Sequence, residues 1–451
     1  MSSRVRIPIK PGARQVVAAL CVGSFLLRLG VILYLRTYEQ SWQTDLGVIA
    51  SGIAEGRGYT YRGLTSAYFG PVYVYLWGLT QALMGAAAGT LIIQVLQAAA
   101  LSTMPWSLYS IATRTFGRTV GMIAGLWFVC YPTYLVLSSQ MQVENFIVPL
   151  LMAVVALGMS LQINPSGRLA VITGILAGIM ILTKGRMAFL CAVVVLVIAW
   201  PSLWEQISRL RAHSSSFSAS NGRLLSLVLA MMAVTIAVIL PWTLRNWYVF
   251  EGRLVPVETA FGMNLWYGHN ENATGTGKMN LDGVQFTKPV DLQAELLTIK
   301  SEPEKDAIYL RYALAFIVGH PREELLLAAK KSLYAWWFDP TSAEANHALY
   351  RWPWMLTLPF FATGLCSARR MWTRSPLVLL LGLLVASTLI QVAFFVVPRF
   401  RMPAEPVVFL FAAQGSVELT QKALGSIIRA VTGKGRSMGD PSVVSPTRAE
   451  M

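Results

Sequence analysis

The sequence is poor in charged residues. Aspartate, glutamate, lysine and arginine make up 13% of its 451 residues, whereas about 25% is usual in soluble domains. Hydrophobic residues make up 55%. This shortage excludes a soluble globular protein, because there are too few charged side chains to cover a surface that faces water on all sides. Most of the chain must be solvated by lipid.

Cysteine and histidine are also scarce. The four histidines are scattered along the chain, so no imidazole cluster indicates a metal site. A divalent ion is compatible with the sequence, but no set of ligands requires one. The cysteines lie within apolar runs, which favours small buried side chains over a disulfide framework; they are Cys21, Cys130, Cys191 and Cys366.

Apolar runs near the ~17–25 residues that cross a bilayer recur along the chain. The stretch 169–203 is interpreted as a hairpin of two spans, because Lys184 and Arg186 interrupt it. The sequence therefore predicts an all-α polytopic membrane protein of about ten transmembrane helices, with interfacial helices in two outer loops. The ten runs are 16–36, 90–113, 118–137, 143–162, 169–184, 186–203, 224–243, 353–370, 375–397 and 403–420.

The distribution of basic residues predicts the orientation. The N-terminus, the loops on its side and the C-terminal tail hold eighteen lysines and arginines against four acids, whereas the opposite side holds equal numbers of each. The net charge of +15 is thus a positive-inside signal and excludes nucleic acid as a partner. We expect a multi-pass protein of the inner (cell) membrane with both termini in the cytoplasm. The first apolar run is long and lacks a small-residue cleavage site, which argues against a signal peptide.

The spans divide the chain into successive parts. They are a cytoplasmic N-terminus (1–15), an N-terminal membrane domain (16–244) containing an outer loop (37–89), a second outer, periplasmic loop (245–352), C-terminal membrane helices (353–420) and a cytoplasmic tail (421–451) expected to be disordered.

Several loops carry structural signals of their own. Residues 70–86 are expected to form an interfacial helix, because a true span there would reverse the orientation of everything that follows. In the second outer loop we expect an irregular stretch at 262–284, followed by membrane-surface helices at 306–319 and 323–338. The Ser- and Arg-rich stretch 204–223 is interpreted as a flexible linker.

Two acids stand where a carboxylate could act at the outer face. Asp45 follows the first span and Glu144 begins the fourth. Acids at membrane depth are costly and usually functional. The alternatives are a solvated loop acid or, for Asp45, a carboxylate stabilised by a helix N-terminus.

Cations at the outer ends of the spans suit a lipid phosphate, which a guanidinium binds well. The alternative for each is snorkelling to lipid headgroups. Arg28 lies within the first span and is expected to pair with an acid or line a polar cavity. The outer cations are Lys184, Arg186, Arg245, Arg399 and Arg401.

Nine short motifs, each weak alone, occur in an order that resembles the membrane-embedded GT-C glycosyltransferases. The likeness is to the bacterial branch akin to protein O-mannosyltransferases and lipid A aminoarabinose transferases, and it covers about residues 16–420. The chain departs from this family in having Gly70-Pro71 where two prolines are usual, and Leu46 where a glutamate often follows the aspartate. The motifs are Asp45 with 53–58, then 68–73, 116–118, 131–132 with 140–144, 178–185, 241–246, 264–270, 319–321 and 398–403.

The resemblance implies a role for each matched residue. Asp45 would deprotonate the acceptor, and Glu144 would bind substrate or assist catalysis. Cations would hold the donor phosphate, namely Lys184, Arg245, Arg399 and Arg401. The motifs also supply four substrate-binding candidates, which are Glu55, Tyr68, Asn246 and His269.

The resemblance also implies an activity. It is an inverting transfer of a hexose or pentose from a polyprenyl-phosphate-linked sugar to a lipid, glycan or protein acceptor on the outer face. Two other classes stay open. A transporter or flippase of polyprenyl-linked glycans would need charged residues in mid-span, and a non-catalytic scaffold would bind the lipid-linked sugar without chemistry.

Overall fold

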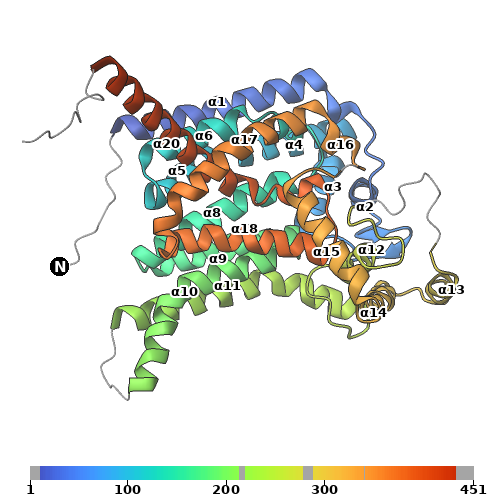
Figure 1. Cartoon of the computed structure of the whole chain (residues 1–451). Helices are drawn as coiled ribbons and strands as arrows, with labels where there is room; N and C mark the ends of the chain where they lie inside the picture. The colour runs from blue at the N-terminus through green and yellow to red at the C-terminus, as the bar shows by residue number, and fades with distance from the viewer. Residues whose placement is uncertain (1–10, 213–218, 278–287, 340, 433–451) are drawn as a thin grey trace, which may run out of the picture.

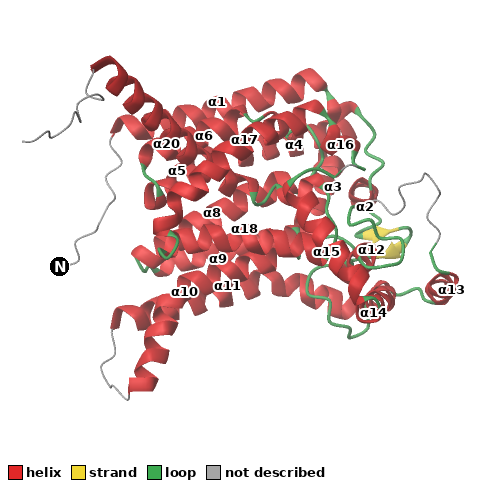
Figure 2. Cartoon of the chain, in the orientation of Figure 1, coloured by secondary structure: helices red, strands yellow, loops and turns green. Residues whose placement is uncertain are grey.

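The computed structural model describes residues 11–212, 219–277, 288–339 and 341–432 as a bundle of helices lying side by side (Figure 1). Helices dominate, and the only strands among the described residues form a short hairpin at one end of the bundle (Figure 2). Helices α2, α12, α13 and α14 also gather at that end, whereas α1 begins and α20 ends at the other (Figure 1).

The elements have the following bounds. The bundle contains α1 (Pro11–Leu35), α4 (Ala86–Ser102), α5 (Met104–Thr115), α6 (Arg118–Cys130), α8 (Glu144–Ile163), α9 (Gly167–Thr183), α10 (Met187–Ala212), α11 (Ala219–Val249), α17 (Ala348–Ser367), α18 (Ser375–Ala393) and α20 (Glu405–Thr432). Shorter elements are η1 (Thr37–Glu39), α2 (Asp45–Ala54), β1 (Thr60–Tyr61), β2 (Leu64–Thr65), α3 (Pro71–Met84), α7 (Pro132–Leu137), α12 (Phe261–Gly268), α13 (Val290–Thr298), α14 (Glu302–Gly319), α15 (Pro321–Trp336), α16 (Ala343–Asn346), η2 (Ala368–Met371) and α19 (Pro398–Arg401).

Six helices of the described chain are long and apolar enough to cross a membrane. They coincide with six of the ten expected spans and comprise Gly12–Leu35, Ala86–Thr115, Glu144–Ile163, Met187–Trp204, Gly222–Val249 and Ser375–Ala393. The other four expected spans fall on α6, α9, α17 and α20, which pack within the same bundle. The predicted all-α polytopic membrane fold is thus confirmed.

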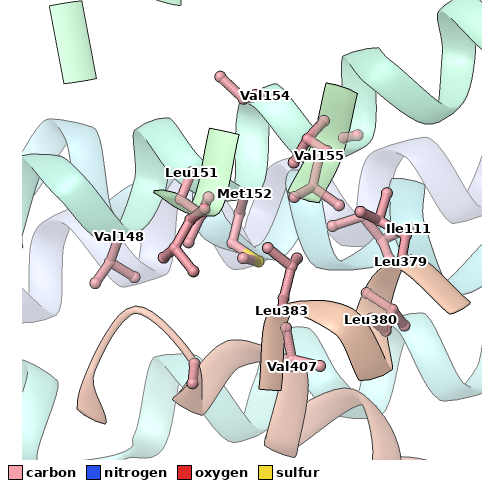
Figure 3. Packing of buried hydrophobic residues seen from close by; sticks show 14 of the residues in the cluster. Ile111, Val148, Leu151, Met152, Val154, Val155, Leu379, Leu380, Leu383 and Val407 are labelled. Atoms are coloured by element: carbon pink, nitrogen blue, oxygen red, sulfur yellow. The ribbon is translucent and has the colours of Figure 1, made fainter. Parts of the chain in front are cut away.

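The core of the bundle is packed by aliphatic side chains from helices far apart in the sequence. Figure 3 shows Ile111 of α5, Leu151 and Val155 of α8, Leu383 of α18 and Val407 of α20 converging. Close helix contact depends on small residues. A Cβ atom at Gly364 of α17 would overlap the carbonyl oxygen of Phe411 in α20, so these two helices approach backbone to backbone.

The outer segments hold more regular structure than the sequence predicted. The stretch expected to be irregular, 262–284, is helical in its first part as α12, and residues 278–287 lie outside the described chain. Helix α13 was not expected, whereas α14 and α15 match the two expected surface helices. In the stretch expected as a linker, 204–223, α10 continues to Ala212 and α11 begins at Ala219. The tail beyond residue 432 lies outside the described chain.

Prolines set the starts of the helices that frame the outer end. Pro71, Pro132, Pro321 and Pro398 each begin a helix, where the missing N–H costs nothing and the fixed φ favours the first turn. The expected interfacial helix at 70–86 is α3. Gly70 before it is required by packing, because a Cβ there would overlap the Leu182 carbonyl and lie 2.8 Å from the Thr183 oxygen.

Candidate active site

A cavity of about 680 Å³ opens where α2, α8, α9 and α10 meet the outer segments. Apolar side chains form one part of its wall, including Ile181, Phe189, Ile239, Phe261 and Phe394. Charged and polar side chains gather in the same cavity, and they are Asp45, Tyr68, Gln142, Glu144, Lys184, Arg186, Glu258, Asn264 and Arg399. The structure therefore brings together five of the ten residues to which the sequence gave a role.

Asp45 is the first residue of α2, and Thr44 caps that helix by accepting from the Gly47 N–H at 3.2 Å. The carboxylate thus stands at the end of α2 where the N–H groups of the first turn are exposed. The β1–β2 hairpin places Tyr61 against it, and the Tyr61 hydroxyl donates to Asp45 Oδ1 at 2.7 Å. Burial, followed by this hydrogen bond, raises the pKa of Tyr61, so the phenol stays a donor at neutral pH.

Tyr68 extends the wall beside the carboxylate. Its ring stacks on that of Tyr61, with centroids 5.3 Å apart and planes 11° from parallel. Burial raises the pKa of Tyr68, with a smaller contribution from the charge of Asp45. The two tyrosines thus give the mouth of the cavity a flat aromatic face next to Asp45.

Glu144 and Arg186 form an ion pair inside the cavity. Arg186 Nη2 lies 3.4 Å from Glu144 Oε1, and the two side chains are only 10% and 2% exposed. The guanidinium also lies 3.6 Å from the centre of the Phe400 ring. Glu144 Oε2 is buried and has no hydrogen-bond partner in the described structure. An unsatisfied buried carboxylate oxygen is costly, and it is free to accept from a ligand.

Lys184 and Glu258 form a second ion pair. Lys184 Nζ lies 3.1 Å from Glu258 Oε2, with side chains 13% and 12% exposed, and Nζ also lies 5.4 Å from the centre of the Phe69 ring. Glu258 belongs to the segment between α11 and α12, to which the sequence analysis assigned no site residue. Its carboxylate reaches the turn between α9 and α10.

Arg399 is the third cation of the cavity. It is exposed, and its Nη1 donates to Gln142 Oε1 at 3.3 Å, an amide and not a carboxylate. The preceding segment is pinned by the second outer loop, since Val396 exchanges backbone hydrogen bonds with Gly275 and Gly277 at 3.1 and 3.0 Å. The outer loop therefore fixes where Arg399 enters the cavity.

Arg245 and Asn246 do not line the cavity. Arg245 Nη1 donates to the Ser66 carbonyl at 2.7 Å and to Asn246 Oδ1 at 3.0 Å, and its guanidinium lies 4.6 Å from the Trp242 ring. Asn246 is fully buried and donates to the Val255 carbonyl at 3.0 Å. Both residues hold loop segments against α11, and the structure places them outside the cavity that holds the other candidates.

Arg401 is also a structural residue. It pairs with Glu405 at 3.0 Å, donates to Tyr350 Oη at 3.0 Å and to the Trp337 carbonyl at 3.2 Å, and its guanidinium lies 3.7 Å from the Trp354 ring. The side chain is only 7% exposed. Its donors bond groups inside the fold, and the side chain does not line the cavity.

His269 lies behind the cavity wall, buried in a cluster with Glu324 and Lys331. Its Nδ1 donates to Glu324 Oε2 at 2.7 Å, and Lys331 Nζ donates to its Nε2 at 3.1 Å, while the Ala393 carbonyl lies 2.9 Å from the same Nε2. Burial and the charge of Lys331 lower the pKa of His269. It braces the end of α18 and does not face the cavity. Glu55, the remaining substrate-binding candidate, pairs with Arg57 at the surface.

Arg28 behaves differently from the expectation. It is fully buried, it donates to the Ser24 carbonyl at 3.2 Å, and its guanidinium lies 5.1 Å from the Phe128 ring. No acid pairs with it in the described structure, and Nε and Nη2 have no hydrogen-bond partner there. Its pairing with an aromatic ring and not an acid was not predicted.

The cavity also contains residues to which the sequence assigned no role. Arg186 was recognised as an outer cation without a role, whereas Glu258 and Gln142 were missed, as was Tyr61, which contacts Asp45 from outside the cavity lining. Gln142 stands two residues before Glu144 in a matched motif, which was the one available signal. Among the described residues, no group of three or more His, Cys, Asp or Glu side chains could hold a metal ion.

Comparison with known protein families yields a match for part of the chain. Residues 69–244 match the family model of dolichyl-phosphate-mannose-protein mannosyltransferase. This segment carries three of the cavity's charged residues, Glu144, Lys184 and Arg186. Comparison with curated protein sequences finds no match.

Among solved structures, the oligosaccharyltransferase AglB from Archaeoglobus fulgidus, in complex with an inhibitory peptide and a dolichol-phosphate, is 15% identical with a TM-score of 0.50. The apo oligosaccharyltransferase of this organism has a TM-score of 0.52, also at 15% identity. These alignments cover 97% and 94% of this chain, but only 53% and 52% of the archaeal chains. This chain thus spans about half the length of those relatives. ArnT from Cupriavidus metallidurans, bound to undecaprenyl phosphate, aligns over 96% of this chain and 82% of its own at 15% identity, with a TM-score of 0.37.

The fold is therefore that of the polytopic GT-C membrane proteins. The match of residues 69–244 to the dolichyl-phosphate-mannose-protein mannosyltransferase model confirms, for that segment, the resemblance read from the sequence.

Proposed function

We propose that this protein is a membrane glycosyltransferase that moves a sugar from a polyprenyl-phosphate donor to an acceptor on the outer, periplasmic face of the membrane. The proposal rests on one observation: the same cavity is lined by the carboxylate of Asp45, by three cations and by apolar side chains. A sugar linked to a lipid phosphate needs all three environments. The family match over residues 69–244 supports the same class of chemistry.

The cations Lys184, Arg186 and Arg399 would form the site for the phosphate of the donor and of the carrier that leaves. Arg399 donates to the amide of Gln142 and to no carboxylate among the described residues, whereas Arg186 is held by Glu144 and lies over Phe400, which fixes the position of its guanidinium. The apolar wall that includes Phe189 and Ile239 suits the prenyl chain, because it continues onto the lipid-facing surface, where Phe189 is half exposed.

Asp45 would act as the general base. It takes the proton of the acceptor hydroxyl as that oxygen attacks the anomeric carbon, while the bond from this carbon to the phosphate oxygen breaks and leaves its electron pair on the phosphate. Tyr61 holds Asp45 Oδ1, so Oδ2 is the oxygen that would face the acceptor. Base catalysis of this kind is worth about 10²–10⁴-fold. The cations stabilise the negative charge that develops on the leaving phosphate.

Glu144 would orient the sugar. Its unpartnered Oε2 can accept from a sugar hydroxyl, and its Oε1 keeps Arg186 in place. The transferred group would be a hexose or a pentose, and the acceptor a lipid, a glycan or a protein.

The test uses the purified full-length chain in liposomes. It is mixed with a panel of polyprenyl-phosphate sugars and a cell-envelope extract as the acceptor source, and released polyprenyl phosphate is measured. Release that depends on the protein supports the proposal. Donor that moves across the bilayer without being consumed would favour a flippase, donor that is bound and never consumed would favour a scaffold, and either result contradicts a transferase.

A further inference from the structure

Glu258 lies over the turn that carries two of the three cavity cations. Its Oε2 bonds Lys184 Nζ at 3.1 Å, and its Oε1 lies only 3.3 Å from where a Cβ of Gly185 would stand. Gly185 separates Lys184 from Arg186, so the carboxylate fills the concave side of this turn. Any larger residue at position 185 would press against it. Glu258 is therefore built into the cation site and is not a loosely placed surface acid.

The charges of the cavity nearly cancel before any ligand binds. Three cations face two glutamates, and the pairing is specific: Glu258 with Lys184 and Glu144 with Arg186, while Arg399 bonds the amide of Gln142. Apart from Asp45, one positive charge is in excess. A sugar phosphodiester carries one negative charge, which that excess balances. The carrier phosphate left after transfer is a monoester with a charge near −2, so it needs a second cation.

We propose that Glu258 holds Lys184 in reserve and releases it to the carrier phosphate as the sugar leaves; this rests on the proposed function. As the bond between the anomeric carbon and the phosphate oxygen breaks, its electron pair stays on that oxygen and the acceptor proton passes to Asp45. The ammonium of Lys184 then shifts one N–H from Glu258 to the phosphate. Glu258 recaptures Lys184 when the carrier departs. It is a positioning residue that acts through Lys184.

This arrangement makes the contact of Lys184 stronger in the transition state than in the bound donor, which is the condition for raising kcat. It also keeps the product from binding too tightly, because Glu258 competes with the phosphate for one ammonium. A purely structural Glu258, one that only orients Lys184 toward the phosphate, would have the opposite effect on product binding when it is removed. The sign of that effect decides between the two roles.

The experiment measures binding of undecaprenyl phosphate by the purified full-length chain in detergent, at a pH where the phosphate is a dianion. We expect Glu258→Gln to tighten this binding about tenfold, since one competing charge is lost. With turnover as the second readout, KM for the donor falls and kcat falls with it, because product release slows. Unchanged or weaker binding by Glu258→Gln overturns the proposal.

Further variants test whether Glu258 acts through its charge and through Lys184. Glu258→Asp retains the charge and is expected to bind like the wild type, and Lys184→Gln is expected to bind more weakly. In the double variant Glu258→Gln with Lys184→Gln, the tightening disappears relative to Lys184→Gln alone, and its persistence would overturn the proposal. Glu295→Gln, which removes the partner of exposed Arg311, is the matched control and leaves binding unchanged. Failure of the wild type to bind undecaprenyl phosphate would instead contradict the proposed function itself.

Discussion

Arg186 bonds Glu144 across 3.4 Å while its guanidinium lies over Phe400, 3.6 Å from the centre of the ring. The pair is nearly buried and links α8 to the turn before α10, and its two residues are 42 positions apart in the chain. Glu144 thereby fixes the direction in which Arg186 presents its remaining donors to the cavity. Charge, planarity and stacking all contribute to this geometry, and only arginine supplies the three together.

Replacing Arg186 by lysine should therefore raise the KM for the donor about tenfold, although the charge is kept. The ammonium has neither the fork that matches a phosphate nor the plane that stacks on Phe400. Donor titration at fixed acceptor measures the change. Arg311→Lys, at an exposed ion pair outside the cavity, serves as the control. An unchanged KM in Arg186→Lys would show that Arg186 does not contact the donor.

Substitution of Arg399 should lower activity and leave stability unchanged, whereas substitution of Arg401 should lower stability. Arg399→Gln leaves the fold intact and raises the donor KM about tenfold, because an exposed cation in the cavity is lost. Arg401→Gln leaves Glu405 buried without its partner and should lower the unfolding free energy by about 3–5 kcal/mol. Thermal unfolding in detergent and donor titration, applied to both variants, provide the measurement. Equal loss of Tm in the two variants would contradict the assignment.

The Lys331 cluster predicts a pH dependence of stability. Burial lowers the pKa of Lys331 to about 8 from an ordinary value of 10.5. Between these values the unfolded chain binds more protons than the folded one, so the unfolding free energy rises as pH increases from about 8 to about 10.5. The slope from this group is at most about 1.4 kcal/mol per pH unit. At and below neutral pH Lys331 is charged in the folded protein, and burying this charge lowers the free energy of unfolding. The neighbouring Glu324 and His269 offset only part of that cost.

Lys331→Met should remove that slope. The measurement is the denaturant midpoint of wild type and variant at several pH values within the window. Lys330→Met, on the neighbouring lysine for which no such burial is found, is the matched control and should keep the wild-type slope. Parallel curves for wild type and Lys331→Met would contradict the burial of a titrating lysine.

Gly70 should be intolerant of a side chain. Its Cβ would overlap the Leu182 carbonyl, so Gly70→Ala must move the segment carrying Tyr68 and Phe69 away from the end of α9. We expect a loss of at least about tenfold in kcat/KM together with a lower Tm. Gly319→Ala is the control, because nothing lies within 4 Å of its Cβ position. Wild-type activity in Gly70→Ala would show that the close approach of this loop is not needed.

The sequence predicted the helical membrane fold and the outer location of the charged residues, because length, apolarity and charge asymmetry act locally along the chain. It could not decide which side of a helix end each residue faces. Arg399 and Arg401 stand two residues apart in the short helix α19, and positions i and i+2 point in nearly opposite directions on a helix. One therefore reaches the cavity and the other the interior. Expecting a helix there, instead of a proline-fixed turn, would have separated them.

Glu258 could not be found from the sequence. It lies in a segment without regular structure, and its partner Lys184 is 74 residues away. The pairing depends on how the chain between α11 and α12 folds back over the turn at Gly185, which no local pattern encodes. The direction in which the His269 side chain points could not be found from the sequence for a similar reason. Its motif matched, but the ring turned toward Lys331 and Glu324 from α15.

The most direct test of the central claim compares the wild type with Asp45→Asn in a single-turnover assay with a polyprenyl-phosphate sugar that the wild type consumes. The amide has nearly the size of the carboxylate and can still bond Tyr61, so donor binding should persist. The account predicts that Asp45→Asn binds the donor with wild-type affinity and releases polyprenyl phosphate at least about 10²-fold more slowly. Release at the wild-type rate would contradict Asp45 as the base and, with it, the proposed chemistry of the cavity.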